Sequence, residues 1–107
     1  MEYSDLASAN FRDATFQKAD LRNATLQDAD LFGANLSEAD LEGADLSKAD
    51  LRNADLRKAK WQKITDVKLA NVFGIKNAPP DFLNWAKQNG AVSKEADAEW
   101  QALLARE

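Results

Sequence analysis

Alanine recurs at every fifth position through most of the first sixty residues. The series runs from Ala9 to Ala59 without a gap, and a large apolar residue stands two positions after each alanine. These residues are Phe11, Phe16, Leu21, Leu26, Leu31, Leu36, Leu41, Leu46, Leu51, Leu56 and Trp61. A helix turns about 100° per residue and would spread such pairs around its whole circumference, whereas a straight strand would point alternate leucines to opposite faces. The period therefore predicts a chain that turns a corner every five residues and keeps both apolar positions inside.

The repeat extends beyond this uninterrupted series. Residues 4–63 form twelve five-residue repeats, and the same small, polar, apolar order continues up to Val67 and Val72. Val67 follows Trp61 by six residues instead of five, which indicates one inserted residue near 62–64, most simply a bulge at a corner. The repeat ends at Gly74, so we expect a repeat domain over residues 1–74.

The segment after the repeat has a different composition. Pro79 and Pro80 cannot donate to a hydrogen-bonded ladder, so they end the repeat. We expect residues 75–107 to form a C-terminal helical domain with one helix over 80–89 and a second that begins after Ser93 as its N-cap. Their apolar faces comprise Phe82, Leu83, Trp85 and Ala86 in the first, and Ala96, Trp100, Leu103 and Leu104 in the second. A stack of coils must be covered at its end, which predicts that both helices cap it.

The order Ala-Asp-Leu followed by two variable residues, as in 19–23, 39–43 and 49–53, resembles the pentapeptide-repeat family. The resemblance implies a mainly β fold, a right-handed quadrilateral β-helix with four repeats in each coil. Residues twenty apart would then stack, and fourteen repeats would make about 3.5 coils, a tower of roughly 17 Å. Residues 74–86 are similar to the C-terminal helical segment of short pentapeptide-repeat proteins from cyanobacteria and chloroplasts, some of which are exported to the thylakoid lumen.

The residue before each large apolar residue is Asp, Asn or Thr in eleven of twelve repeats, Lys60 being the exception. Stacked carboxylates such as Asp20 and Asp40 are open to two interpretations, a paired acid and base or calcium ladder, and hydrogen bonding to the backbone at each corner. The second is favoured because the pattern repeats on all four faces, whereas a catalytic pair would be singular. We therefore predict no metal site.

One outward column holds alternating arginine and phenylalanine, namely Arg12, Phe32, Arg52 and Phe73. These four residues are the candidate protein-binding stripe. The alternative, which we favour, is stacking of guanidinium groups on rings between successive coils. Two other columns alternate in charge, Lys18, Glu38 and Lys58 in one and Arg22 and Glu42 in the other, and these predict solvated ion-pair ladders.

The composition argues against an enzyme. The chain has no cysteine and no histidine, which excludes thiol nucleophiles, thiolate metal sites and histidine-based triads. No P-loop, dinucleotide fingerprint or nucleophile–base pair is present. We predict a non-enzymatic protein without a cofactor. Nucleic-acid binding is not expected, because Trp61 falls in a core register and is not available to stack on bases.

Charge is uneven along the chain. Residues 1–50 hold 11 acidic and 4 basic residues, a net of −7, whereas residues 51–74 hold 2 acidic and 6 basic residues, a net of +4. Either the basic part meets an acidic partner, or the surface positions have drifted. We expect a monomer or a weak end-to-end dimer.

Taken together, these features predict a rigid scaffold or protein-interaction module with an unidentified protein partner. The alternative is a DNA mimic that inhibits or protects a type II topoisomerase. B-DNA carries one charge per about 1.7 Å, so a mimic of this length would present roughly 10 negative charges. Residues 1–74 hold 13 acidic and 10 basic residues, a net of −3, which disfavours the mimic.

The sequence leaves the compartment open. No stretch has the length of a membrane span, and residues 1–5 show neither a basic nor an apolar leader region. We expect a cytoplasmic protein if the chain is complete, and a thylakoid-lumen or periplasmic protein if it is the mature form of an exported one.

Overall fold

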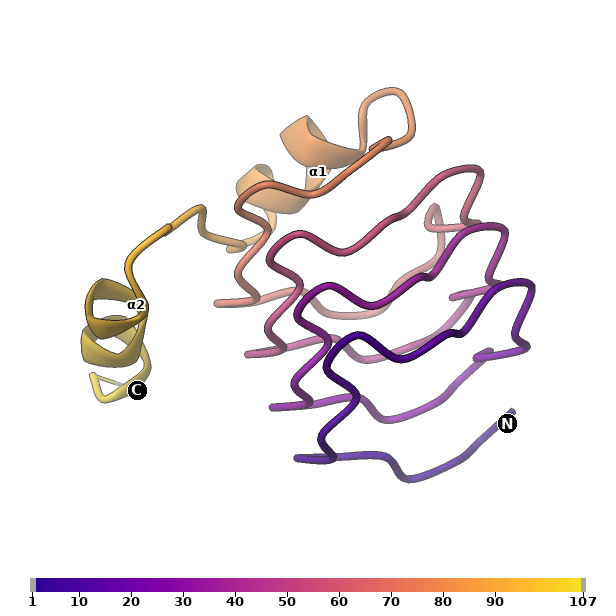
Figure 1. The fold of residues 1–107 in the computed structure, drawn as a ribbon, viewed down its shortest axis with the longest axis horizontal. Helices are drawn as coiled ribbons and strands as arrows, with labels where there is room; N and C mark the ends of the chain where they lie inside the picture. The colour runs from indigo at the N-terminus through magenta and orange to yellow at the C-terminus, as the bar shows by residue number, and fades with distance from the viewer. Residues whose placement is uncertain (1, 107) are drawn as a thin grey trace.

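The chain winds into a four-sided coil, drawn from indigo to orange in Figure 1, and two helices follow it. A computed structural model describes residues 2–106, so the outermost residues of the two expected domains, Met1 and Glu107, lie outside it. The strand segments are so short that each makes a single parallel bridge to the next coil. Twelve such bridges connect the described residues, for example Thr25 to Asp45.

The bridges fix the register of the coils. They join residues twenty apart from the first pair, Asp5 and Thr25, to the pair Asp40 and Lys60. Backbone hydrogen bonds follow the same spacing, so that the Leu26 N–H donates to the Asp45 carbonyl at 2.8 Å. The prediction that residues twenty apart stack is confirmed.

One extra residue is taken up just after the predicted place. The Thr65 N–H donates to the Ala44 carbonyl at 2.9 Å, while the Leu46 N–H donates to the Asp66 carbonyl at 2.8 Å. Thr65 and Asp66 therefore both stand opposite Asp45, which is the arrangement of a β-bulge. From this point on, bridged residues lie twenty-one apart.

The corners between Leu6 and Ala59 are tight turns with one residue in the left-handed region. At a representative corner the Ala39 N–H donates to the Leu36 carbonyl at 3.1 Å, and Glu38 has a φ of 58°. A positive φ at the third residue is the requirement of a type II turn. Gly43, with a φ of 75°, meets a second constraint, because a Cβ there would overlap the Oδ1 of Asn23 in the coil before it.

The interior is filled by the two apolar positions of each repeat. Every leucine and alanine of these two series from Leu21 to Leu56 is at most 1% exposed. In the first coil Leu6 and Phe11 are only half-buried, and the Phe11 ring packs edge-on against Phe16 at 4.9 Å between centroids. The middle of the coil is therefore drier than its beginning.

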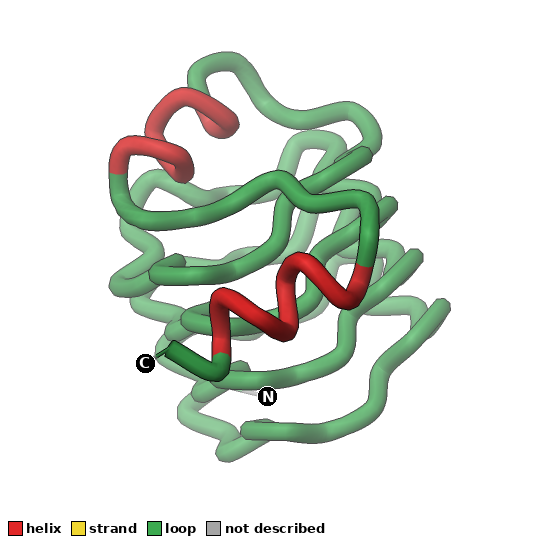
Figure 2. Tube along the Cα trace, turned by 90° about the vertical axis from the view of Figure 1, so that its left-hand side faces the viewer, coloured by secondary structure: helices red, strands yellow, loops and turns green. Residues whose placement is uncertain are grey.

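Helix α1, Phe82–Gln88, lies over the last turns of the coil (Figures 1 and 2). Its Phe82 is fully buried, and Phe82 and Trp85 pack on Trp61 with centroid distances of 5.5 and 5.3 Å. The helix begins two residues later than expected, because Asp81 is left-handed with a φ of 68°. It ends where Gly90, with a φ of 97°, turns the chain away.

The segment between the helices returns to the coil. Val92 accepts from the Val72 N–H and donates to the Ala70 carbonyl, both at 2.8 Å. The side chain of Asn71 then donates to the Lys94 carbonyl at 2.8 Å and accepts from the Lys94 N–H at 3.1 Å. These bonds hold the segment extended, which is why Ser93 does not cap the second helix as expected.

Helix α2, Asp97–Leu104, begins only after this attachment and has Ala96 at its N-cap position. It runs along the side of the coil instead of across its end, as the two views show (Figures 1 and 2). Of the two helices expected to cover the end, only α1 lies there. Trp100 is the buried residue of α2.

Candidate interaction surface

The polar residues at the corners hydrogen-bond to the backbone. In eleven repeats the side-chain oxygen accepts the N–H two residues further on. The acceptors are Asp5, Asn10, Asp20, Asp30, Asn35, Asp40, Asp45, Asp50, Asp55, Asp66 and Asn71. The favoured interpretation of the stacked carboxylates is thus confirmed. Among residues 2–106, no group of three or more metal-ligating side chains is placed to hold an ion.

The outward column of arginine and phenylalanine is brought together over three successive coils. The Arg12 Cζ lies 4.5 Å from the centroid of Phe32, and the Arg52 Cζ lies 5.2 Å from the same ring. Stacking between coils, the favoured alternative for this stripe, is confirmed for these three residues. The carbonyl of Phe73 accepts from the Asn53 N–H at 3.1 Å and continues the column along the backbone.

Arg52 is the centre of this surface and is only 7% exposed. Its Nε and Nη2 donate to the two carboxylate oxygens of Asp50 at 2.9 and 2.6 Å. Nη2 also donates to Asp97 of α2 at 3.1 Å. The hydrogen bonds with Asp50 raise the pKa of Arg52, so the guanidinium stays charged although it is buried.

The same local arrangement occurs in the exposed pair Asp20 and Arg22. Nε and Nη2 of Arg22 donate to the two oxygens of Asp20, both at 2.8 Å. These hydrogen bonds hold the pKa of Asp20 well below its usual range. Both side chains are 43% exposed, against 8% and 7% for Arg52 and Asp50. The environment of Arg52 near α2 therefore distinguishes it from an otherwise equal pair.

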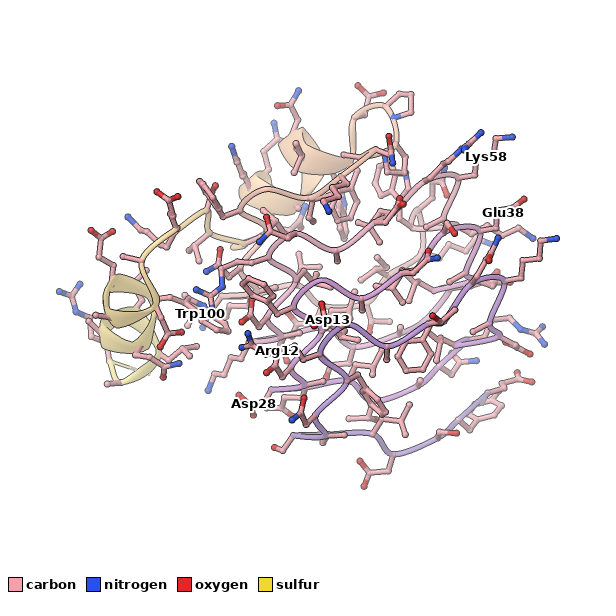
Figure 3. All side chains as sticks on the ribbon, in the orientation of Figure 1. Arg12, Asp13, Asp28, Glu38, Lys58 and Trp100 are labelled. Atoms are coloured by element: carbon pink, nitrogen blue, oxygen red, sulfur yellow. The ribbon has the colours of Figure 1, made fainter. Side chains whose placement is uncertain are left out.

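Helix α2 is attached to this wall through few groups. The indole Nε1 of Trp100 donates to the Leu69 carbonyl at 2.8 Å, and the Arg52 Cζ lies 5.5 Å from the Trp100 ring. Arg52 also donates through Nη1 to the carbonyl of Glu95 at 3.3 Å. Figure 3 shows Trp100 lying between α2 and the coil, on the side that carries Arg12 and Asp28.

A groove of about 360 Å³ remains between α2 and the wall. The coil contributes mostly charged residues to it, among them Arg12, Asp28, Lys48 and Asp50. The helix contributes Asp97, Trp100, Gln101 and Leu104. The helix thus rests on the wall at a few points and leaves space beneath it.

The two columns of alternating charge do not form the expected ladders. Among the residues that the structure describes, no ion pair joins Lys18, Glu38 or Lys58 to one another, and Glu38 and Lys58 project outward on the side away from α2 (Figure 3). Arg22 pairs instead with Asp20 in its own repeat and with Glu2, while Glu42 pairs with Lys63 at 3.8 Å. Arg22 and Glu42 thus each pair with a residue one coil away, Glu2 and Lys63, but not with each other.

The sequence interpretation missed Asp97, Trp100 and Leu69 as members of this surface. The sequence places Trp100 on an apolar helix face, and its burial agrees with this. The apolar face does not indicate which residues of the coil Trp100 contacts. The available signal was the spacing of a carboxylate and an indole three residues apart, which places them on one helix face. Nothing in the spacing points to Arg52.

The sequence comparisons agree with the repeat. The family model described as "Pentapeptide repeats" matches residues 1–28 and 24–60, in eight copies. No curated protein sequence matches the chain. Neither helix within residues 2–106 has the length and apolar character required to cross a membrane.

Three solved structures of cyanobacterial pentapeptide-repeat proteins are similar to this chain. Rfr23 from Cyanothece 51142 is 28% identical, with a TM-score of 0.55, over 85% of this chain and 60% of its own. HetL from Nostoc sp. strain PCC 7120, a protein involved in heterocyst differentiation regulation, is 32% identical over 71% of this chain and 35% of its own, with a TM-score of 0.44. The protein alr5209 from Nostoc PCC 7120 is 29% identical over 87% of this chain and 83% of its own, with a TM-score of 0.44. This chain thus spans 60% of Rfr23 and 35% of HetL, and the Rfr23 structure supports a shared β-helix fold.

Proposed function

This chain belongs to the pentapeptide-repeat family, and on that premise we propose that it is a non-enzymatic scaffold that presents its flat walls to a protein partner. Pentapeptide-repeat proteins are in general non-catalytic structural proteins. The proposal goes further in assigning this particular chain an interaction role.

The continuous backbone ladder is the observation that carries this proposal. The first three coils are bridged to one another on all four sides and the third to the next on three, and the interior positions from Leu21 to Leu56 exclude water. A side chain on the outside is therefore held at a fixed distance from its neighbours above and below, near the ~4.8 Å spacing of paired strands. Such a surface binds by shape and charge, with little ordering of the backbone on association.

The finer architecture forms part of the proposal. We take residues 1–74 as a right-handed coil of about 3.5 turns and residues 75–107 as its C-terminal helical part. The contact of Phe82 with Trp61 supports a capping role for α1. Any end-to-end association of copies would use the opposite, less buried end near Phe11.

Four matched variants test whether one wall binds a partner. A protein captured by the full chain is purified and titrated against Arg12→Glu, Gln27→Lys, Arg57→Glu and Lys63→Glu, which change an exposed side chain on each of the four walls in turn. We expect one variant to weaken binding by about tenfold and the other three to bind as the wild type does. Equal binding by all four would contradict the proposal.

The DNA-mimic alternative has less support. The acidic residues of the corners are engaged in turns, and Arg12, Arg22 and Arg52 each pair with a carboxylate on the surface. With a net charge of −3 over residues 1–74, the coil lacks the roughly 10 charges of a DNA segment of similar length. Inhibition in a gyrase supercoiling assay would reverse this ranking.

A further inference from the structure

Helix α2 is attached to the outside of the coil by an acidic and an aromatic side chain. Asp97 forms an ion pair with Arg52 at 3.1 Å, and Trp100 adds its hydrogen bond to Leu69 and its ring contact with Arg52. Trp100 is buried, but it is not part of the cluster that contains the coil interior and Phe82. The wall therefore recognises α2 with groups that are separate from those that hold the coil together.

The fit between α2 and the wall is incomplete. The groove of about 360 Å³ lies beneath Gln101 and Leu104. The groove is open to solvent and large enough for water, and charged residues of the coil line most of it. The groove leaves room for a partner helix with longer polar side chains at these two places than α2 carries.

The attachment of the chain changes abruptly before α2. Up to Lys94, the backbone is fixed to the coil through Val92 and the side chain of Asn71. Beyond it, five of the eight residues from Asp97 to Leu104 are exposed, Leu103 and Leu104 are half-buried, and only Trp100 is buried. The chain between Lys94 and Asp97 is the place where α2 can swing away while the coil stays folded.

We infer that Arg52 and the Leu69 carbonyl, with Arg12 lining the groove beside them and Phe32 stacked between the two arginines, form a docking site for a helix of a partner protein that carries a carboxylate and, three residues later, a tryptophan. Helix α2 occupies this site in cis and must leave before the partner binds. The inference rests on the proposed interaction role and specifies its wall and its partner. The partner helix pairs its carboxylate with Arg52 and donates its indole N–H to Leu69, as Asp97 and Trp100 do.

The contact in trans can be measured with the α2 sequence itself. The probe is a fluorescent peptide of residues 94–106, and its binding is followed by anisotropy with the full chain and with the full-length variant Asp97→Ala/Trp100→Ala. In this variant α2 has lost both recognition groups, while the wall is unchanged. We expect the variant to bind the peptide at least about tenfold more tightly than the wild type, in which the site is filled.

Two controls show whether the recognition groups are the ones named. A peptide with its own Trp100→Ala change should bind the double variant about tenfold more weakly. In the double variant, a further Arg52→Ala change should abolish binding, whereas Arg22→Ala, in the matched exposed pair, should not. Arg52→Ala is expected to weaken folding, so Arg12→Ala is included as a second change in the same wall. Circular dichroism checks that the coil is intact in both variants.

Several results would overturn the inference. These are equal binding of the peptide by wild type and double variant, absence of binding by a folded double variant, and binding that survives loss of the peptide tryptophan. Sedimentation tests whether the helix in the site comes from a second copy of this chain. A dimer that the wild type forms and the double variant does not would mean that α2 is exchanged between copies. In each case the scaffold proposal would still hold if the binding of a captured partner were weakened by a variant on one of the other three walls.

Discussion

Helices α1 and α2 are similar in length, at 7 and 8 residues, but they are held in opposite ways. Helix α1 inserts Phe82 and Ala86 into the same apolar cluster that fills the coil. Helix α2 lies on a charged wall, and its buried Trp100 is held through a hydrogen bond and a guanidinium contact. The first therefore completes the core, whereas the second covers a surface.

This difference shows what an amphipathic pattern does and does not determine. Both sequences have an apolar face, and in both the structure buries part of it. The position of that face depends on the chain between the helices, which Val92 and Asn71 fix to the coil. Stability should therefore respond strongly to changes in α1 and weakly to changes in α2.

The largest effect is expected from Phe82→Ala. The ring is fully buried against Trp61, and its loss leaves a cavity between the helix and the coil. We expect the free energy of unfolding to fall by about 3–5 kcal/mol. Urea denaturation followed by circular dichroism measures the change. Leu83→Ala, in the half-buried neighbour, should cost clearly less, and equal losses would show that α1 is not part of the core.

Arg52→Ala should have the next largest effect. It leaves the carboxylate of Asp50 buried without its partner, which typically costs about 3 kcal/mol or more. In the matched variant Arg22→Ala the carboxylate of Asp20 is already exposed and is solvated by water, so the loss should be clearly smaller. Thermal denaturation of the two variants measures the contrast. A similar loss in both would mean that α2 does not alter the environment of Arg52.

Trp100→Ala should release α2 without unfolding the coil. The hydrogen bond to Leu69 and the contact with Arg52 are worth about 1–2 kcal/mol together. Hydrogen exchange measures this locally, with faster exchange expected in residues 97–104 and unchanged protection at coil positions such as Leu36. Loss of protection in the coil as well would place α2 within the same cooperative unit as α1.

The smallest effect is expected from Asp97→Asn. The Asp97 side chain is 60% exposed, so its ion pair with Arg52 contributes only about 0.5 kcal/mol and weakens as salt is added. The amide exchange of α2 should increase slightly at low salt and converge with that of the wild type at high salt. A large effect that persists at high salt would contradict this assignment.

Much of the coil follows from the sequence because its contacts are periodic. A five-residue repeat fixes which side chains point inward, and a twenty-residue coil fixes which residues stack, so Leu26 and Leu46 share a wall as the repeat predicts. The corner hydrogen bonds were also predictable, since Asp and Asn in that position bond to the backbone two residues on.

The candidate surface was only partly predictable. The stacking of Arg12, Phe32 and Arg52 follows from their shared column, but the burial of Arg52 does not. Its burial depends on α2, which starts four residues after Ser93 because Val92 extends the ladder first. This pairing joins residues that are distant in the sequence and lies outside the repeat, so no periodic signal marks it.

The twenty-residue register also limits how the gene for such a chain can change in length. Duplication of one whole coil, for example residues 25–44, would leave every later residue on the same wall, one coil further along the axis. Gain or loss of a single repeat between Arg52 and Leu69 would instead carry Leu69 around a corner, away from the wall of Arg52, and α2 could no longer reach both. Slippage by single repeats in this interval would thus keep the coil folded but would separate the groups to which α2 is attached.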